Sequence, residues 1–412
     1  MLFGSVLGVV KVRDFLVCEL RRGLRSTTYW CFAFASFFVV FFLPAGVGAV
    51  RSVFYLLIVI PAFFCMDKKL LRALFKSSVF GFLLLLSLLS LLLLSGDEKA
   101  LDVLKFVLSS ACVVVGATHL GRWREEKVRH YSFFVLAGLV FYVLLNVAFA
   151  YFRGEWLPGR RIPILYGQAK SVIFTADLVV GVLVFYSWLS IKSERWIAVV
   201  LANVATLLVI MFFLQSRSAL AVWFAATAAM LFLAGGRIFF RVGVALVLSI
   251  GLVFWGLAVS GVGSDLIARA DSYRVEIWRG YVDAAVSCGW LLGCGWGAEL
   301  RFVTHNGLPI SHPHSMYVQH FYWAGSVGLF LLLACLGSAL YESWKRSSPL
   351  FWLLLPGCVA LSLDGKALVS APNERWLLVL LPLLFIAAEQ VSRSIESADG
   401  SLFSFDTIRK KS

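Results

Sequence analysis

Long apolar runs alternate with short polar connections along almost the whole chain. About 20 consecutive apolar residues form a helix long enough to cross the hydrocarbon core of a bilayer. Because no water reaches that core, backbone groups must be paired within each segment, so these runs are predicted to be helices. The pattern predicts an all-α polytopic membrane protein with about twelve transmembrane helices, at residues 29–50, 52–66, 79–95, 101–120, 132–152, 171–191, 196–214, 218–236, 241–262, 316–340, 350–364 and 375–389.

The basic residues orient the predicted helices. Most of the 37 Lys and Arg lie in alternate connections and at the two ends of the chain. Cytoplasmic segments of membrane proteins carry such an excess. We therefore expect the basic N-terminal segment, residues 1–28, and the tail, residues 390–412, to lie in the cytoplasm. Helices one to nine then occupy residues 29–262, a large external loop occupies residues 263–315, and helices ten to twelve occupy residues 316–389.

Composition agrees with the membrane class and excludes others. Hydrophobic residues make up 60% of the chain, charged residues 15%, and the mean hydropathy is +0.88. A soluble globule or a disordered chain is far more polar. The net charge of +14 is compatible with basic segments beside anionic lipid, so we expect membrane lipids as partners and no nucleic acid. No Cys-x-x-Cys pair occurs in the sequence, and we expect no metal and no cofactor.

Several arginines fall in connections assigned to the outside, against the usual bias. They are Arg160, Arg161, Arg217 and Arg274. A guanidinium presents a planar fork of N–H donors that suits phosphate oxygens. These four residues are therefore candidates to bind a diphosphate, and the alternative is a scatter of solvated charges.

Three further charged residues leave alternatives open. Asp177 lies within the sixth predicted helix, where a carboxylate is either functional or the partner of an external arginine. Lys366 and Arg375, in the last external connection, either contact a lipid diphosphate or extend toward lipid headgroups.

The external loop is long enough to contain a helix and functional residues. Arg274 and Trp278 are spaced by one helical turn and would share a face. Trp278 is a candidate to stack on a sugar ring, or alternatively to anchor the loop at the membrane surface. Cys288 and Cys294 are either disulfide partners or two separate thiols, and their spacing leaves the choice open.

A histidine ends this loop, just before the tenth predicted helix. Ser311 is the expected N-cap, which puts Pro313 in the first turn. His314 would then lie in the positive field of the helix N-terminus, which favours a neutral ring able to accept a proton. His314 is therefore the candidate catalytic base, with His312 as the alternative. The non-catalytic alternative is a cap or a water-facing residue.

Three motifs resemble those of the O-antigen ligase and polymerase superfamily, and they lie between residues 200 and 335. In chain order they are Gln215-Ser216-Arg217-Ser218, then Arg274-Val275-Glu276-Ile277-Trp278 with Leu292-Gly293-Cys294-Gly295-Trp296-Gly297, and finally His314-Ser315-Met316-Tyr317-Val318-Gln319 leading into Trp323-Ala324-Gly325-Ser326-Val327-Gly328. Each motif alone is weakly specific, and their order adds specificity. The chain departs from the family at Ser315, where Asn is common, so the catalytic histidine stays open between His314 and His312.

The resemblance implies a glycosyltransferase of the bacterial inner membrane that acts at the periplasmic face without a metal. It would move O-antigen polysaccharide from undecaprenyl diphosphate to the lipid A–core oligosaccharide, with residues 263–315 as the periplasmic catalytic loop. His314 would be the general base. The diphosphate would be held by Arg160, Arg161, Arg217 and Arg274. The external loops contain no obvious Asp/Glu pair, which argues against an ordinary two-carboxylate glycosidase.

Other functions stay open at this point. An O-antigen polymerase or a protein O-oligosaccharyltransferase would use the same lipid-linked donor and share the motifs. The moderate loop length and the number of predicted helices favour a ligase. A transporter of an anionic lipid or glycan would carry charged residues along several helix interiors. Asp177 is the main residue of that kind, so the sequence favours chemistry at one face over translocation.

Overall fold

The computed structural model describes residues 19, 23–94, 100–121, 125–260, 273–305, 307, 309–365 and 367–398, apart from some side chains between residues 238 and 260. Lys366 and the first part of the predicted loop, residues 263–272, lie outside this part of the chain. The elements in chain order are α2 (Thr27–Val40), α3 (Val47–Phe54), η1 (Tyr55–Val59), α4 (Ile60–Cys65), α5 (Lys68–Lys76), α6 (Ser78–Leu92), α7 (Ala100–Thr118), α8 (Glu125–Phe152), α9 (Val172–Lys192), α10 (Trp196–Val209), η3 (Ile210–Leu214), α11 (Arg217–Ala234), α12 (Gly236–Ser260), α14 (Arg274–Gly289), β1 (Phe302–Val303), β2 (Pro309–Ile310), α15 (Met316–Lys345), α16 (Phe351–Leu363), η4 (Trp376–Leu380) and α17 (Leu381–Ala398), where η marks a π-helical turn.

The predicted all-α class is confirmed, and the protein has the helices of a multi-pass membrane protein. Within the described residues, eight helices are long and apolar enough to cross a bilayer, or nine if the bent pair α5–α6 forms one span. Three shorter apolar helices, Thr27–Val40, Phe240–Gly251 and Phe351–Leu363, fall on further predicted spans. The total of twelve therefore stays a prediction. The strands β1 and β2 form one small antiparallel hairpin, in which Phe302 is opposite Ile310.

The first two predicted spans have a different boundary in the structure. The sequence divided them at Arg51, whereas the chain breaks between α2 and α3 and Arg51 lies inside α3. The break contains Pro44, which lacks a backbone N–H and cannot continue a helix interior. The helix then runs without interruption from Val47 through η1 to the end of α4.

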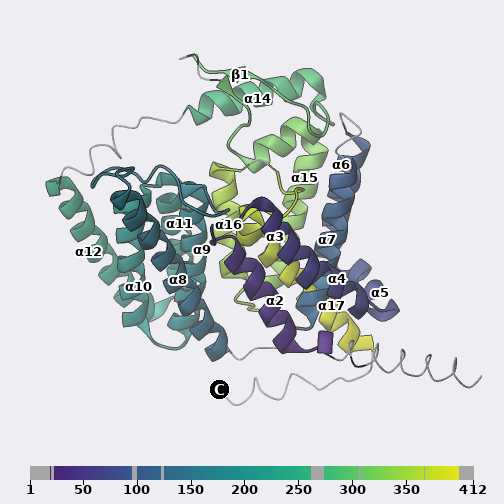
Figure 1. The fold of residues 1–412 in the computed structure, drawn as a ribbon, viewed down its shortest axis with the longest axis horizontal. Coiled ribbons are helices and arrows are strands. Elements are labelled where there is room, and N and C mark those ends of the chain that lie inside the picture. Colours follow the sequence, from purple (N-terminus) through teal and green to yellow (C-terminus); the bar gives the residue numbers. More distant parts are fainter. Residues whose placement is uncertain are drawn as a thin grey trace, which may run out of the picture.

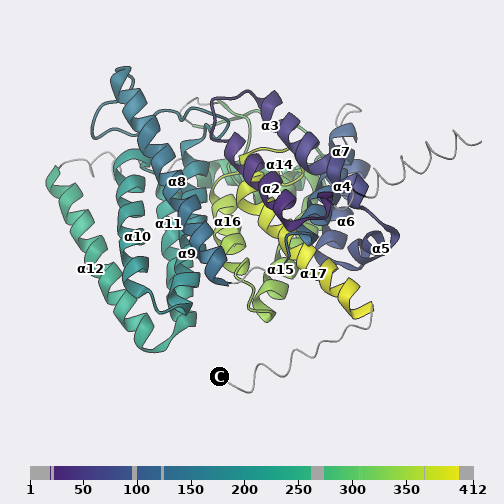
Figure 2. The same cartoon turned by 60° about the horizontal axis from the view of Figure 1, so that its bottom comes forward.

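The helices pack side by side, and α14 lies across one end of them (Figure 1). Helices α8 to α12 occupy one side of the molecule and α4 to α7 the other, with α16 between them (Figures 1 and 2). We call the end that carries α14 and the hairpin the α14 end. The start of α15 and the end of α16 also lie there, and the connection between α15 and α16 lies at the opposite end.

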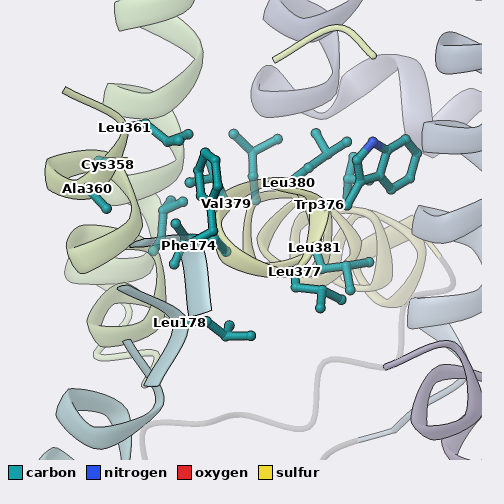
Figure 3. Close-up of a cluster of buried hydrophobic side chains, with 14 of the residues drawn as sticks. Phe174, Leu178, Cys358, Ala360, Leu361, Trp376, Leu377, Val379, Leu380 and Leu381 are labelled. Carbon is teal, nitrogen blue, oxygen red and sulfur yellow. The ribbon is translucent and has the colours of Figure 1, made fainter. Parts of the chain in front are cut away.

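A buried apolar cluster joins α9, α16 and the start of the last helix. Phe174 and Leu178 of α9, Leu361 of α16 and Val379 of η4 point into the same space (Figure 3). Trp376, also in η4, is almost fully buried and contacts aromatic rings of α3 and α7. Between helices in lipid, close van der Waals packing of large side chains such as these contributes to holding the elements together. The cluster fixes the ends of α9, α16 and η4, which carry the candidate site.

A break inside α15 attaches the glycine-rich loop after α14. Ala324 and Gly325 have non-helical backbone angles, and φ of Gly325 is +61°. The backbone N–H groups of Cys294 and Gly295 donate to the carbonyls of Tyr322 and Trp323 at 2.8 and 3.0 Å. A Cβ on Gly325 would lie 2.3 Å from the carbonyl carbon and oxygen of Leu291. The two glycine motifs seen in the sequence therefore bind each other backbone to backbone.

Candidate active site

The start of α15 differs from the prediction. Ser315 is the N-cap, with its side chain accepting the backbone N–H of Val318 at 3.5 Å, and the helix begins at Met316. The expectation that Ser311 caps this helix and that Pro313 lies in its first turn is therefore wrong. The physical reason is His314, whose φ of +52° is left-handed and cannot belong to the helix. His314 lies just before the cap, at the α14 end.

His314 contacts a carboxylate from another helix. Its Nδ1 lies 3.3 Å from Oδ1 of Asp364, the residue that caps the C-terminus of α16. The same oxygen accepts the backbone N–H of Gly365 at 2.9 Å. Because an ionised carboxylate only accepts hydrogen bonds, the hydrogen of a neutral His314 ring belongs on Nδ1, and Nε2 then has the free lone pair. The His314 side chain is 38% exposed and Asp364 only 10%, so the histidine is accessible and the carboxylate is shielded.

Trp278 and His312 hold the backbone around His314. The indole N–H of Trp278 donates to the carbonyl of Pro313 at 2.9 Å. Nδ1 of His312 accepts the backbone N–H of His314 at 3.3 Å, and the centres of the two imidazole rings are 4.0 Å apart. Three predicted residues are therefore brought together, with Trp278 and His312 contacting the segment that carries His314.

Arg274 contributes a positive charge to the surroundings of His314 and Asp364. It is the first residue of α14, and its charge acts on both Asp364 and Asp177. Asp177 is completely buried in α9, and neither of its carboxylate oxygens has a hydrogen-bond partner. The negative charge of Asp364 also acts on Asp177. The predicted Arg274 and Asp177 thus belong to the same charged neighbourhood as the His314–Asp364 pair.

Arg375 is a second guanidinium in this neighbourhood. It directly precedes η4, and its guanidinium carbon lies 5.7 Å from the ring centre of Phe174 in α9. Its Nε is buried without a hydrogen-bond acceptor. The charges of Glu374 and Asp364 both act on it. A mostly buried cation with an unused donor can bind an anion.

Arg160, Arg161 and Arg217 form a second group at the α14 end. Arg217 is the first residue of α11 and follows the N-cap Ser216, which comes after the π-helical turn η3 and the left-handed Gln215. The side-chain amide of Gln215 donates to the carbonyl of Gly159 at 3.0 Å. The backbone N–H of Ile162 donates to the carbonyl of Phe213, also at 3.0 Å. These two bonds bracket the pair Arg160–Arg161 and hold it beside the segment that leads into Arg217.

Two of the contacts that attach the loop after α14 to that helix involve Glu276 and Cys288. Oε2 of Glu276 lies 2.8 Å from Nδ1 of His305, and Oε1 accepts the backbone N–H of His305 at 2.8 Å. The hydrogen bond from the His305 ring, and then the one from its backbone, lower the pKa of Glu276 below its ordinary value. A disulfide joins Cys288 near the end of α14 to Cys294, which resolves the alternative that the sequence left open. Both contacts hold the loop against the helix that begins with Arg274.

Asp364 was missed by sequence reasoning. It is the last residue of an apolar run, and its partner His314 is 50 residues away in the sequence. The sequence feature that could have indicated Asp364 is a carboxylate directly before Gly365, at the end of a predicted span. Arg375 was considered in the sequence, but its position beside Phe174 and Asp364 depends on how η4 packs against α9.

Comparison with known proteins agrees with the motifs. The chain matches no described protein-family profile. It is similar to a protein named O-antigen ligase from Pseudomonas aeruginosa strain PAO1, with 32% identity over 126 residues. The match covers 29% of this chain and 31% of that relative. The resemblance to O-antigen ligases is thus confirmed over part of the chain.

Proposed function

We propose that this protein is a membrane glycosyltransferase that moves O-antigen polysaccharide from undecaprenyl diphosphate to the lipid A–core oligosaccharide. The observation that carries the proposal is the contact between His314 and Asp364 beside Arg274 at the α14 end. The partial similarity to an O-antigen ligase supports this class of reaction. This group of residues places a proton acceptor next to a cation. Glycan transfer from a glycosyl diphosphate requires both.

His314 acts as the general base in this mechanism. Its Nε2 takes the proton of the acceptor hydroxyl while the hydroxyl oxygen bonds to the anomeric carbon of the donor glycan. The bond between that carbon and the phosphate oxygen breaks, and its electron pair leaves with undecaprenyl diphosphate, which gains one negative charge. Asp364 holds the imidazole through Nδ1 and stabilises the imidazolium that forms, so it is a positioning residue. The imidazolium later returns its proton to solvent or to the departing diphosphate.

The guanidinium groups stabilise the charge that develops on the leaving diphosphate. We assign the reacting phosphate to Arg274 and Arg375, because Arg274 acts electrostatically on Asp364, the partner of His314, and the charge of Asp364 acts on Arg375, which has a buried, unused N–H donor. Arg217, with Arg160 and Arg161, lies on the second group of segments and is assigned to the remaining diphosphate oxygens. Fixed cations of this kind contribute most where charge appears in the transition state.

The proposed location follows from the basic residues. A multi-pass protein of the bacterial inner membrane, with both termini in the cytoplasm, would present the α14 end to the periplasm. The lipid-linked donor and the lipid A–core acceptor would then both reach His314 from the outer leaflet. The connections at the opposite end hold most of the described basic residues, which supports this orientation.

A gene deletion tests the proposed function directly. The lipopolysaccharide of the deletion strain is separated on a gel, and lipid-linked polymer is measured in the same cells. The proposed ligase predicts loss of all polymeric O-antigen from lipopolysaccharide and accumulation of polymer on undecaprenyl diphosphate. Complementation with the wild-type gene should restore the ladder, and complementation with His314→Ala should not.

The other outcomes identify the alternatives. A single repeat unit on the core would identify a polymerase. Unchanged lipopolysaccharide together with loss of glycan from proteins would identify a protein O-oligosaccharyltransferase. Unchanged lipopolysaccharide with unchanged glycoproteins would overturn the proposal of O-antigen transfer altogether.

A further inference from the structure

The helix α5 is oriented differently from the helix that follows it. It runs from Lys68 to Lys76 and is bent by 80° from α6, with the break at Ser77. It lies at the edge of the molecule, beside α4 and α17 (Figures 1 and 2). If α6 crosses the bilayer, a helix at this angle lies close to the plane of the membrane surface.

The angle between α5 and α6 is fixed by a polar network. Oγ of Ser77 donates to the side-chain carbonyl of Gln390 in α17 at 2.6 Å, and the Gln390 amide donates to Oγ of Ser78 at 3.0 Å. At its other end, α5 is capped by Asp67, whose carboxylate accepts the backbone N–H of Leu70 at 2.9 Å. Asp67 also pairs with Arg25 at 3.4 Å. Both ends of α5 are therefore held, and its outer face has a defined direction.

The apolar residues of α5 divide between two faces. One face is buried against α17 and neighbouring helices, and it consists of Leu70, Ala73 and Leu74. A second, outward strip is formed by Leu71 and Phe75, which are one turn apart and 40% and 60% exposed. Packing explains the first face. The exposed strip points away from the molecule and has no such explanation.

The remaining side chains of α5 are all basic. They are Lys68, Lys69, Arg72 and Lys76, all of them exposed, and no acidic residue occurs between Lys68 and Lys76. At 100° per residue, this basic strip lies directly beside the strip of Leu71 and Phe75. A helix with adjacent apolar and basic strips is suited to the boundary between acyl chains and headgroups.

We propose that α5 is a binding site for anionic phospholipid. Leu71 and Phe75 enter the acyl region, and Lys68, Arg72 and Lys76 contact the phosphate and negative headgroup. Charge complementarity selects the ligand, because a basic residue near an anionic surface gains on the order of a fivefold preference per charge. This site lies at the end opposite α14 and does not depend on the proposed transfer reaction.

Lipid binding to the purified full-length protein tests the proposal. The protein in neutral detergent is titrated with phosphatidylglycerol or phosphatidylcholine, and bound lipid is counted by native mass spectrometry. The variant K68Q/R72Q/K76Q should bind phosphatidylglycerol at least about tenfold more weakly, with phosphatidylcholine binding unchanged. The matched control K127Q/R195Q/K345Q removes the same charge from exposed residues of α8, the start of α10 and α15, and should keep the wild-type affinity.

A second variant separates a lipid from a free anion. Phe75→Ser keeps every charge of α5, and it should weaken phosphatidylglycerol binding because the acyl contact is lost. Inorganic phosphate added at millimolar concentration should not displace the lipid. Equal losses in the two triple variants would overturn the proposal, since net charge alone would then explain the binding. Unchanged binding in Phe75→Ser with displacement by phosphate would identify a simple anion site and would equally contradict it.

Discussion

His314 Nδ1 lies 3.3 Å from Asp364 Oδ1, although the two residues are separated by 50 positions in the sequence. The histidine precedes α15 and the carboxylate ends α16, so packing of the two helices creates the pair. A histidine held in this way keeps one nitrogen engaged and the other available. The geometry is that of a base with an orienting carboxylate, and the candidate chemistry rests on it.

The first prediction concerns that carboxylate. Asp364→Asn should lower the rate of glycan transfer by between about 10-fold and 1000-fold, because an amide no longer fixes the tautomer of His314 or stabilises its charged form. The KM for the lipid-linked donor should change little, since donor binding is assigned to arginines. Asp364→Glu should restore part of the rate. The measurement is steady-state transfer in proteoliposomes at varied donor concentration, with Asp283→Asn, an exposed carboxylate of α14, as control. A raised KM with unchanged kcat would assign Asp364 to binding instead.

The second prediction separates the two neighbouring histidines. His314→Ala should reduce transfer by about 10²–10⁴-fold, the usual contribution of a general base, while the protein stays folded and binds donor. His312→Ala should be much milder, because Nδ1 of His312 accepts the backbone N–H of His314, and His312 is assigned to supporting that segment and not to the reacting hydroxyl. Transfer assays with both purified variants decide the matter. If His312→Ala is inactive and His314→Ala is normal, the base has been assigned to the wrong residue.

The third prediction concerns the arginines. Arg274→Ala and Arg217→Ala should each nearly abolish transfer, because a lost charge-stabilising donor costs about 3 kcal/mol in a preorganised site. Lysine at either position should restore only part of the activity, since it supplies charge without the planar fork. Alanine at Arg160 or Arg161 should have a weaker effect. Arg153→Gln is the matched control, because Arg153 is already paired with Glu155 at 3.0 Å. If Arg274→Ala and Arg217→Ala both transfer glycan at a near-normal rate with normal protein levels, these two arginines do not bind the diphosphate.

The sequence predicted the parts of the fold that depend on local pattern. Hydropathy gave the all-α class, and the spacing of Arg274 and Trp278 correctly placed both on one helix. The start of α15 was predicted wrongly, because capping rules favoured Ser311 and could not show that His314 adopts a left-handed backbone. That conformation accompanies tertiary contacts of Trp278 and Asp364, which a local pattern does not contain.

The sequence pointed to most residues of the candidate site, but it did not show which of them contact one another. His314, Arg274 and Asp177 come together, but the residue with which all three interact, Asp364, lies at the end of an apolar run and was not predicted. Long-range pairs of this kind follow from how helices pack, and hydropathy gives the number and rough position of helices without their neighbours. The second and third motifs contain Arg274, Trp278 and His314, whose segments meet in the structure, and three-dimensional packing determines which of their residues are in contact.

The fourth prediction concerns the orientation in the membrane. A cysteine introduced at Glu299, which is exposed in the loop after α14, should react with a membrane-impermeant maleimide added to the periplasm. A cysteine at Glu125, at the start of α8, should react only after the inner membrane is opened. Asp271 would serve equally for the first label but lies outside the described residues. The reverse labelling pattern would overturn the orientation and, with it, the periplasmic assignment of the site.

The last prediction concerns the backbone contact between the two glycine motifs. Gly325→Ala should destabilise the protein by at least about 3 kcal/mol, because the new Cβ meets the Leu291 backbone at 2.3 Å and φ is +61°. Gly293→Ala should act in the same direction, since its Cβ would lie 2.6 Å from the Tyr322 carbonyl oxygen. Gly337→Ala, farther along α15, meets no atom within 4 Å and should be neutral or slightly stabilising. Thermal unfolding in detergent compares the three variants. If Gly325→Ala melts together with Gly337→Ala, the break in α15 is not held by this contact, and the glycine motifs need another explanation.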